Sequence, residues 1–222
     1  MDARFVNGGK LAWPSCMLVS GPSLSGKSSL VSKIVSSSVY EKTPTLVFYC
    51  YNEWQPLFET FPPHIKVQFN EGLPNLDELK RLSKTERVLL ILDDLMTKLD
   101  KFPDAEKLFS VASHHYDMSI IAIIHSIFYS KTIRNLRLNS SYLCIFKNNA
   151  DMLSIRNLAS QLFPWNRSLF IKTYEDATRL PHSYLFVDNH KTTEKELRLR
   201  TSLFPDEVAS AYIEKWCPSG IL

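Results

Sequence analysis

Blocks of apolar residues separated by polar segments run through the first half of the chain and predict alternating strands and helices. Short apolar runs predict strands over residues 16–20, 45–51, 65–69, 88–94 and 119–126. Polar segments with apolar residues at helical spacing predict helices over residues 27–38, 76–83 and 103–116. The runs at 88–94 and 119–126 lack polar alternation, which is typical of strands buried on both faces of a parallel sheet. Together these elements indicate an α/β fold with right-handed crossovers.

The second half of the chain continues the same alternation. Strands are predicted over residues 142–147, 183–190 and 197–204. Helices are predicted over residues 150–163, 167–179 and 205–216. No internal repeat, low-complexity segment or linker divides the sequence, so we expect one domain over residues 1–222, with a mainly parallel sheet flanked by helices.

Composition is that of an ordinary globular protein and disfavours several other classes. The 222 residues, 45% hydrophobic and 22% charged, are enough to bury one core. No run approaches the roughly 18 apolar residues of a membrane-spanning helix, and the N-terminus lacks the apolar block of a secretory signal, so we expect a soluble intracellular protein. The net charge of +3 does not by itself indicate nucleic-acid binding. The four cysteines lie far apart in the sequence and have no neighbouring histidine at metal-ligand spacing, which disfavours a zinc site and a disulfide framework. We therefore predict reduced thiols at Cys16, Cys50, Cys144 and Cys217.

A glycine-rich loop joins the first of these predicted strands to the first predicted helix, in the stretch LVSGPSLSGKSSLV at residues 18–31. Gly21, Gly26, Lys27 and Ser28 match the pattern G-x-x-x-x-G-K-[ST], in which backbone N–H groups curl around phosphates at a helix N-terminus. Lys27 would reach the β- and γ-phosphates of ATP, and the Ser28 hydroxyl would ligate Mg²⁺. The alternative is a Ser/Gly turn before an ordinary helix. The predicted phosphate-binding residues are Gly21, Pro22, Ser23, Leu24, Ser25, Gly26, Lys27, Ser28 and Ser29.

Two further predicted strands end in polar residues that would complete such a site. In ILDDL, Asp93 is the candidate partner of Mg²⁺ and Asp94 the candidate group that polarises the attacking water, unless both only cap the following helix. In P-loop ATPases of the additional-strand class, a strand between the phosphate-loop strand and the acidic strand ends in a sensor of the γ-phosphate. His125 is at that position, although an ordinary strand-terminal histidine is the alternative. His114 and His115 are weaker candidates, expected near a helix end.

The order of these motifs resembles the poxvirus-type DNA-packaging ATPases of the FtsK-HerA superfamily, with the closest similarity to versions carried by adintoviruses and polinton-like elements. The resemblance runs from about Leu18 to Pro205 and rests on GPSLSGKSS, ILDDL, SIIAIIHSIFYSKTIRNLRLNSSYLCIFKN, IRNLASQLFP, YEDATRLPHSYLFVDNH and LRLRTSLFP. It implies a RecA-like fold of the additional-strand type. Two positions depart from the family pattern: His125 replaces a common Gln, and Asp94 replaces the Glu of many cellular relatives.

The resemblance also implies a homo-oligomeric ring, a pentamer or hexamer, that hydrolyses ATP and drives double-stranded DNA into a capsid. Capsid proteins would then be partners, and the site of action would be a virus factory or the host nucleus or cytoplasm. In such rings an arginine of one subunit contacts the γ-phosphate bound by its neighbour. Arg134 matches the family's arginine and Arg137 is the second candidate, with a solvated basic helix face as the alternative. The candidates for DNA contact are Lys131, Lys147, Arg156 and Arg167. The alternative for each of them is an ordinary surface residue.

Two other classes remain open at the level of the sequence. A nucleoside or nucleotide kinase would also use a P-loop, but the chain lacks the paired CxxC motifs of thymidine-kinase-like chains and an arginine-rich lid. A non-catalytic nucleotide-binding scaffold is disfavoured by the intact Lys27, Ser28 and Asp93. A switch GTPase is disfavoured because NHKT at residues 189–192 does not match the guanine-reading motif NKxD.

Overall fold

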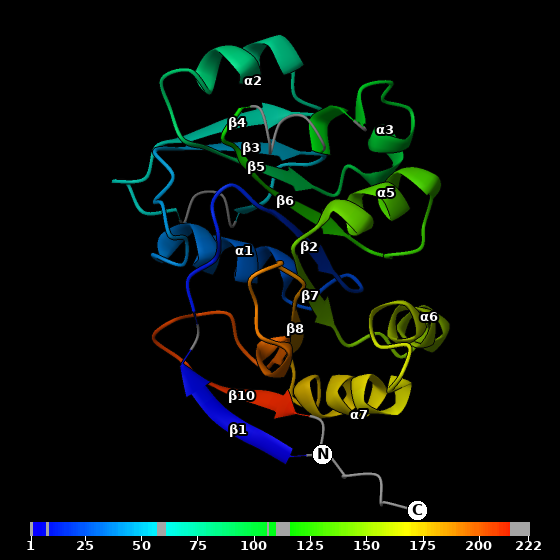
Figure 1. Ribbon diagram of the computed structural model, residues 1–222. Helices are drawn as coiled ribbons and strands as arrows, with labels where there is room; N and C mark the ends of the chain where they lie inside the picture. Colours follow the sequence, from blue (N-terminus) through cyan, green and yellow to red (C-terminus); the bar gives the residue numbers. More distant parts are fainter. Residues whose placement is uncertain (1, 8, 57–60, 106, 110–115, 214–222) are drawn as a thin grey trace, which may run out of the picture.

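One mixed β-sheet runs through the protein, and helices cover both of its faces (Figure 1). The computed structural model describes residues 2–7, 9–56, 61–105, 107–109 and 116–213. Its strands are β1 (Asp2–Asn7), β2 (Cys16–Ser20), β3 (Leu46–Tyr51), β4 (Val67–Glu71), β5 (Val88–Asp93), β6 (Ser119–Ile124), β7 (Tyr142–Phe146), β8 (Tyr184–Asp188), β9 (Leu199–Arg200) and β10 (Val208–Ile213). Its helices are α1 (Lys27–Ser36), α2 (Leu76–Leu82), α3 (Met96–Asp100), α5 (Lys131–Asn139), α6 (Met152–Leu162), α7 (Arg167–Ala177) and the 3₁₀ helix η2 (Lys195–Leu197).

The strand order is β1-β10-β9-β8-β7-β2-β6-β5-β3-β4 in the described part of the chain. The strands from β7 to β4 in this order run parallel, and the remaining strands extend the sheet in antiparallel pairs. This arrangement confirms the predicted α/β fold, with β6 between β2 and β5 as the additional strand. Ser20 pairs with Ile124, and Asp93 pairs with Ile123, so these three strands end at the same edge of the sheet. The residues that follow them therefore meet there.

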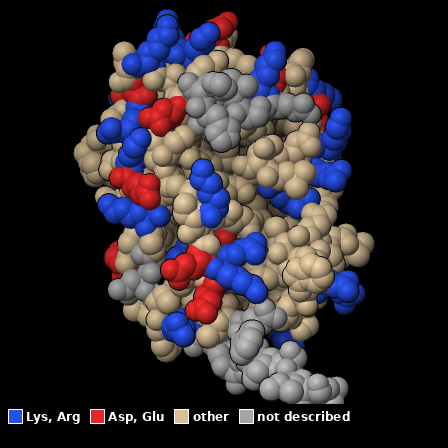
Figure 2. Space-filling view, in the orientation of Figure 1, with Lys and Arg blue, Asp and Glu red and all other residues tan. Residues whose placement is uncertain are grey.

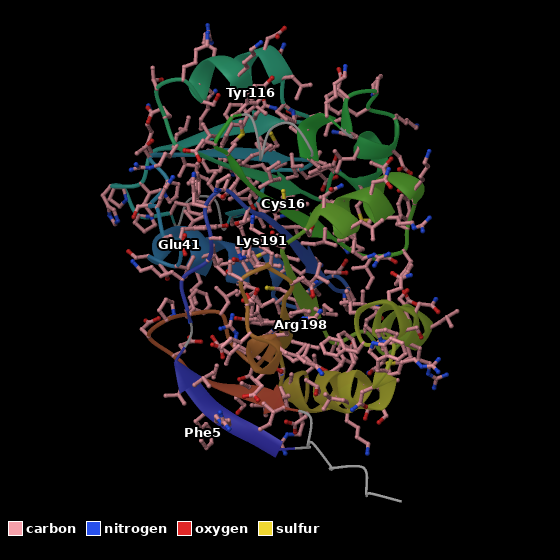
Figure 3. The ribbon with its side chains drawn as sticks, viewed as in Figure 1. Phe5, Cys16, Glu41, Tyr116, Lys191 and Arg198 are labelled. Atoms are coloured by element: carbon pink, nitrogen blue, oxygen red, sulfur yellow. The ribbon has the colours of Figure 1, made fainter. Side chains whose placement is uncertain are left out.

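Alternate residues of the strands belong to two hydrophobic layers on opposite faces of the sheet. In β5, Leu90 and Leu92 belong to the layer that includes residues of α2, α3, α5, α6 and α7, whereas Leu89 and Ile91 belong to the layer that includes α1. Figure 1 shows α1 on the opposite side of the central strands from α3 and α5. Figure 3 shows Phe5 on the outer strand β1, where its ring is exposed. Burial on both faces explains the uninterrupted apolar runs of the central strands.

Most predicted elements are confirmed, with ends shifted by a few residues. Of the predicted helix over 103–116, residues 105 and 107–109 are helical, whereas His114 and His115 lie outside the described residues. The short helix α3, helix α5, the 3₁₀ helix η2 and the edge strand β1 have no counterpart among the predicted elements. None of the described helices has the length and apolar character needed to cross a membrane. Cys16, Cys50 and Cys144 are buried, and no disulfide joins them to one another, whereas Cys217 lies outside the described residues.

The predicted C-terminal helix over residues 205–216 is wrong. Residues Val208–Ile213 form β10, which pairs antiparallel with β1. Ala209 and Ala211 are buried while Val208 is exposed, which is the alternation of a strand. Helix propensity is a weak prior, and pairing with the unpredicted strand β1 overrides it here. The predicted strand over 197–204 is likewise reduced to the two residues of β9.

Candidate active site

The loop between β2 and α1 requires glycine at two positions. A Cβ added to Gly21 would lie 2.6 Å from Cβ of Phe146 and 2.9 Å from Oγ of Ser25, which leaves no room for a side chain. Gly26 has φ +104°, a left-handed conformation that glycine adopts without strain, and it directly precedes α1. Close packing and backbone conformation thus explain both glycines of the phosphate-loop pattern.

Lys27 opens α1, and its side chain turns back into the loop. Its Nζ donates to the carbonyl oxygens of Gly21 at 2.8 Å and of Pro22 at 2.7 Å. Burial lowers the pKa of Lys27, and the nearby carboxylates of Asp93 and Asp94 oppose this by raising it. The ammonium group therefore lies beside the first turn of α1, whose N–H groups have no partners within the helix. A helix N-terminus together with a cation is suited to binding phosphate.

Asp93 ends β5 beside the loop and is only 3% exposed. The Tyr49 hydroxyl on β3 donates to Oδ2 of Asp93 at 2.8 Å, and the Ser28 side chain also hydrogen-bonds to Asp93. Burial raises the pKa of Asp93 and Asp94 adds to this, while the hydrogen bonds and the charge of Lys27 lower it. The Ser28 hydroxyl and the Asp93 carboxylate thus offer two adjacent hard oxygen donors, the ligands that Mg²⁺ prefers.

Asp94 and His125 face each other beyond the ends of the neighbouring strands β5 and β6. Nε2 of His125 lies 3.0 Å from Oδ1 of Asp94, and both side chains are partly exposed. Asp94 has φ 53°, in the left-handed region that non-glycine residues seldom adopt. The N-cap of α3 is Leu95, so helix capping does not explain either aspartate.

One cavity of about 1010 Å³ brings the predicted groups together. The loop residues that line it are Ser23, Leu24, Gly26, Lys27, Ser28 and Ser29. Asp93, Asp94 and His125 line the same cavity. The other predicted loop residues, Gly21, Pro22 and Ser25, line smaller cavities that adjoin the loop. The segments that follow the parallel strands β2, β5 and β6 therefore line one cavity.

The two predicted arginines of α5 differ in exposure. Arg137 is 5% exposed, and its guanidinium lies 4.7 Å from the centre of the Phe128 ring. The role of Arg137 across a subunit interface stays a prediction, and its burial makes it the less accessible of the two arginines. Arg134 is exposed on the same helix.

Several residues that the sequence did not single out also reach the site. Tyr49 contacts Asp93, and the cavity is also lined by Lys33, Gln55, His182, Tyr184, Phe204 and Glu207. Nδ1 of His182 lies 3.2 Å from the backbone oxygen of Ser25, a contact between positions 157 residues apart. Long-range contacts of this kind leave no local pattern in the sequence.

The fold and the site together define a class: an α/β protein with the P-loop NTPase fold, in which the glycine-rich loop lies at the carboxyl edge of the parallel strands. No protein-family model matches the chain, and no curated protein matches it. Among solved structures, the chain is similar to the genome-packaging NTPase B204 from Sulfolobus turreted icosahedral virus 2 in complex with sulfate. The TM-score is 0.52 at 14% identity, over 81% of this chain and 94% of that one.

Two related structures give the same result. B204 of the same virus in complex with ATP-gammaS has a TM-score of 0.52 at 13% identity, over 81% of this chain and 94% of that one. B204, the DNA-packaging ATPase from Sulfolobus turreted icosahedral virus, has a TM-score of 0.57 at 12% identity, over 81% of this chain and 95% of that one. Likeness at this level of identity shows a shared fold.

Proposed function

We propose that this protein hydrolyses ATP and uses the energy to move double-stranded DNA into a capsid, as a motor of the FtsK-HerA superfamily. One observation carries the proposal: the loop with Lys27, the Ser28 and Asp93 donors and the Asp94–His125 pair open into one cavity. The fold is shared with B204, a DNA-packaging ATPase. Within the superfamily, the order of motifs in the sequence favours the poxvirus-type branch.

Binding of ATP would begin at the phosphate loop. The N–H groups of the first turn of α1 and the Lys27 ammonium would hold the phosphate oxygens. Ser28 and Asp93 would hold Mg²⁺, because their oxygen atoms are adjacent at the end of the loop. The bound ion supplies charge neutralisation at the phosphate oxygens.

Hydrolysis needs a group that accepts a proton from the attacking water. Asp94 is suited to this because it is partly exposed to the cavity, whereas Asp93 is held by Tyr49 and Ser28. The water oxygen bonds to the γ-phosphorus, the bond to the leaving oxygen of ADP breaks, and the water proton passes to Asp94. His125 lies against Asp94 in the same cavity and would donate a hydrogen bond to the γ-phosphate.

Oligomerisation would complete the site. The exposed Arg134 would contact the γ-phosphate bound by the neighbouring subunit, as in a pentameric or hexameric ring. DNA would be held through phosphate contacts that form and break during translocation, which needs few cations and no large basic excess. The exposed candidates for these contacts are Lys131, Lys147, Arg156 and Arg167. Figure 2 shows Lys and Arg spread over the visible face and interspersed with Asp and Glu, which agrees with the modest net charge.

Double-stranded DNA is expected to stimulate ATP hydrolysis severalfold at low salt, and the stimulation should decline as salt rises because phosphate contacts release counterions. Formation of ADP and release of inorganic phosphate are both measured with and without duplex DNA over a salt series. A matched series with a nucleoside in place of DNA identifies a kinase, which would form ADP only with that acceptor. Hydrolysis that duplex DNA leaves unchanged at every salt concentration contradicts the proposal.

Tyr49→Phe is expected to raise the Mg²⁺ concentration needed for half-maximal hydrolysis by about tenfold, the size typical of losing a group that supports a metal ligand. The Tyr49 hydrogen bond lowers the pKa of Asp93, so its removal raises that pKa. Protons then compete with Mg²⁺ for Asp93, and the difference between variant and wild type should grow as the pH falls. The measurement is phosphate release over Mg²⁺ titrations at several pH values.

Tyr40→Phe is the matched control, because the Tyr40 hydroxyl is buried without a hydrogen-bond partner among the described residues. It should leave the Mg²⁺ requirement unchanged. Equal Mg²⁺ requirements for Tyr49→Phe and wild type would show that Tyr49 does not support Asp93.

A further inference from the structure

The cavity extends well beyond the groups that would hold phosphates. Its far end is lined by Lys33 of α1, Tyr184 of β8, and Thr201, Phe204 and Glu207 from the segment between β9 and β10. The volume of about 1010 Å³ is at the upper end of the roughly 300–1,000 Å³ of small-molecule pockets. The space is therefore larger than a chain of phosphates requires.

Helix α1 connects the two ends of the cavity. Lys27 is its first residue and Lys33 lies six residues later, roughly 9 Å along the axis at 1.5 Å per residue. Ser29 and Leu30 line the cavity between them. A ligand whose phosphates occupy the loop would thus extend along α1 toward Lys33.

The far end combines a flat apolar ring with one cation and one anion. Nζ of Lys33 lies 4.1 Å from the centre of the buried Phe204 ring and also pairs with Oε1 of Glu207. The Ser202 hydroxyl donates to the other carboxylate oxygen of Glu207. The side chains of Lys33 and Glu207 remain 50% and 39% exposed, so both can still meet a ligand.

We infer that Lys33, Phe204 and Glu207 form the subsite for the base of the nucleoside triphosphate. The inference rests on the proposed function, because it assumes that the phosphates bind at the loop. A purine has a flat π-system, ring nitrogens that accept hydrogen bonds and N–H groups that donate them. Lys33 supplies a donor and Glu207 supplies an acceptor, and the buried Phe204 ring lies under the Lys33 ammonium and forms part of the apolar lining. This segment directly precedes β10, so the C-terminal part of the sheet would take part in recognising the nucleotide.

Inorganic tripolyphosphate and ATP distinguish this subsite from the phosphate loop, because both carry three phosphates and only ATP carries a base. The dissociation constants of both ligands are measured calorimetrically with Mg²⁺ for wild type, Lys33→Met and Glu207→Gln. We expect each variant to bind ATP about tenfold more weakly, as for a lost charge-assisted contact, and to bind tripolyphosphate as the wild type does. Lys33→Arg should recover part of the affinity for ATP.

The matched control is Lys172→Met, which alters an exposed lysine of α7 and should leave both ligands unaffected. Unchanged ATP binding by Lys33→Met and Glu207→Gln overturns the inference. The ion pair of Lys33 and Glu207 would then only join α1 to the segment before β10. An equal loss of affinity for ATP and tripolyphosphate overturns it as well. Failure of the wild type to bind either ligand contradicts the proposed function itself, whereas equal wild-type affinity for both contradicts only the base subsite.

Discussion

Lys27→Ala is expected to lower the rate of ATP hydrolysis by roughly 10²–10³, the loss typical of removing a fixed group that stabilises transition-state charge. The Nζ of Lys27 is buried inside the phosphate loop, where little solvent screens its charge. Negative charge on the transferring phosphoryl group would then lose its nearest fixed cation. Release of inorganic phosphate at saturating ATP measures the effect.

Lys172→Ala is the control for this substitution, because it also removes a lysine but from the exposed surface of α7. It should hydrolyse ATP at the wild-type rate. A thermal melt establishes that Lys27→Ala remains folded. A folded Lys27→Ala protein with wild-type hydrolysis would show that the loop is not the site of the reaction.

Arg134→Ala is expected to reduce hydrolysis by about 10³–10⁵, as for loss of an arginine supplied across a subunit interface. Arg134 is exposed on α5 and is absent from the residues that line the cavity of its own chain, so it would act on a neighbour. Arg81→Ala on α2 is the matched control, and it should leave the rate unchanged.

Mixing two inactive variants tests this arrangement directly. A Lys27→Ala subunit retains Arg134 and can supply it to a neighbouring Arg134→Ala subunit, whose phosphate loop is intact. Mixed assemblies should therefore recover part of the wild-type hydrolysis, with a maximum at intermediate ratios. Assemblies that contain both variants and recover no activity at any ratio would exclude Arg134 as a residue that acts between subunits.

The central sheet could be predicted from the sequence because its strands are buried on both faces. The apolar runs that became β5 and β6 have no helical periodicity, and their length fits strands. The edge of the sheet could not be predicted in the same way. The alanines of β10 favour a helix by intrinsic propensity, and pairing with β9 and with β1, which is more than 200 positions away, makes this segment a strand.

In the functional site, too, some residues could be predicted from the sequence and others could not. Gly21, Gly26 and Lys27 are recognisable because the loop needs them at fixed spacing, and Asp93 because a carboxylate at the end of a buried strand calls for a partner. Tyr49 was missed because its contact with Asp93 arises from the pairing of β3 with β5. The burial of Arg137 was missed because the ring of Phe128 comes to it only in the folded chain.

A crystal structure with Mg²⁺ and a non-hydrolysable ATP analogue tests the central claim most directly, namely that the phosphate loop and Asp93 hold one Mg²⁺-bound triphosphate. The account predicts phosphates within hydrogen-bond distance of the loop N–H groups and Lys27. It also predicts Mg²⁺ about 2.1 Å from Oγ of Ser28, with the Asp93 carboxylate turned toward the ion. The account would be contradicted by an analogue bound away from the loop. It would also be contradicted by an ion that lies near neither Ser28 nor Asp93.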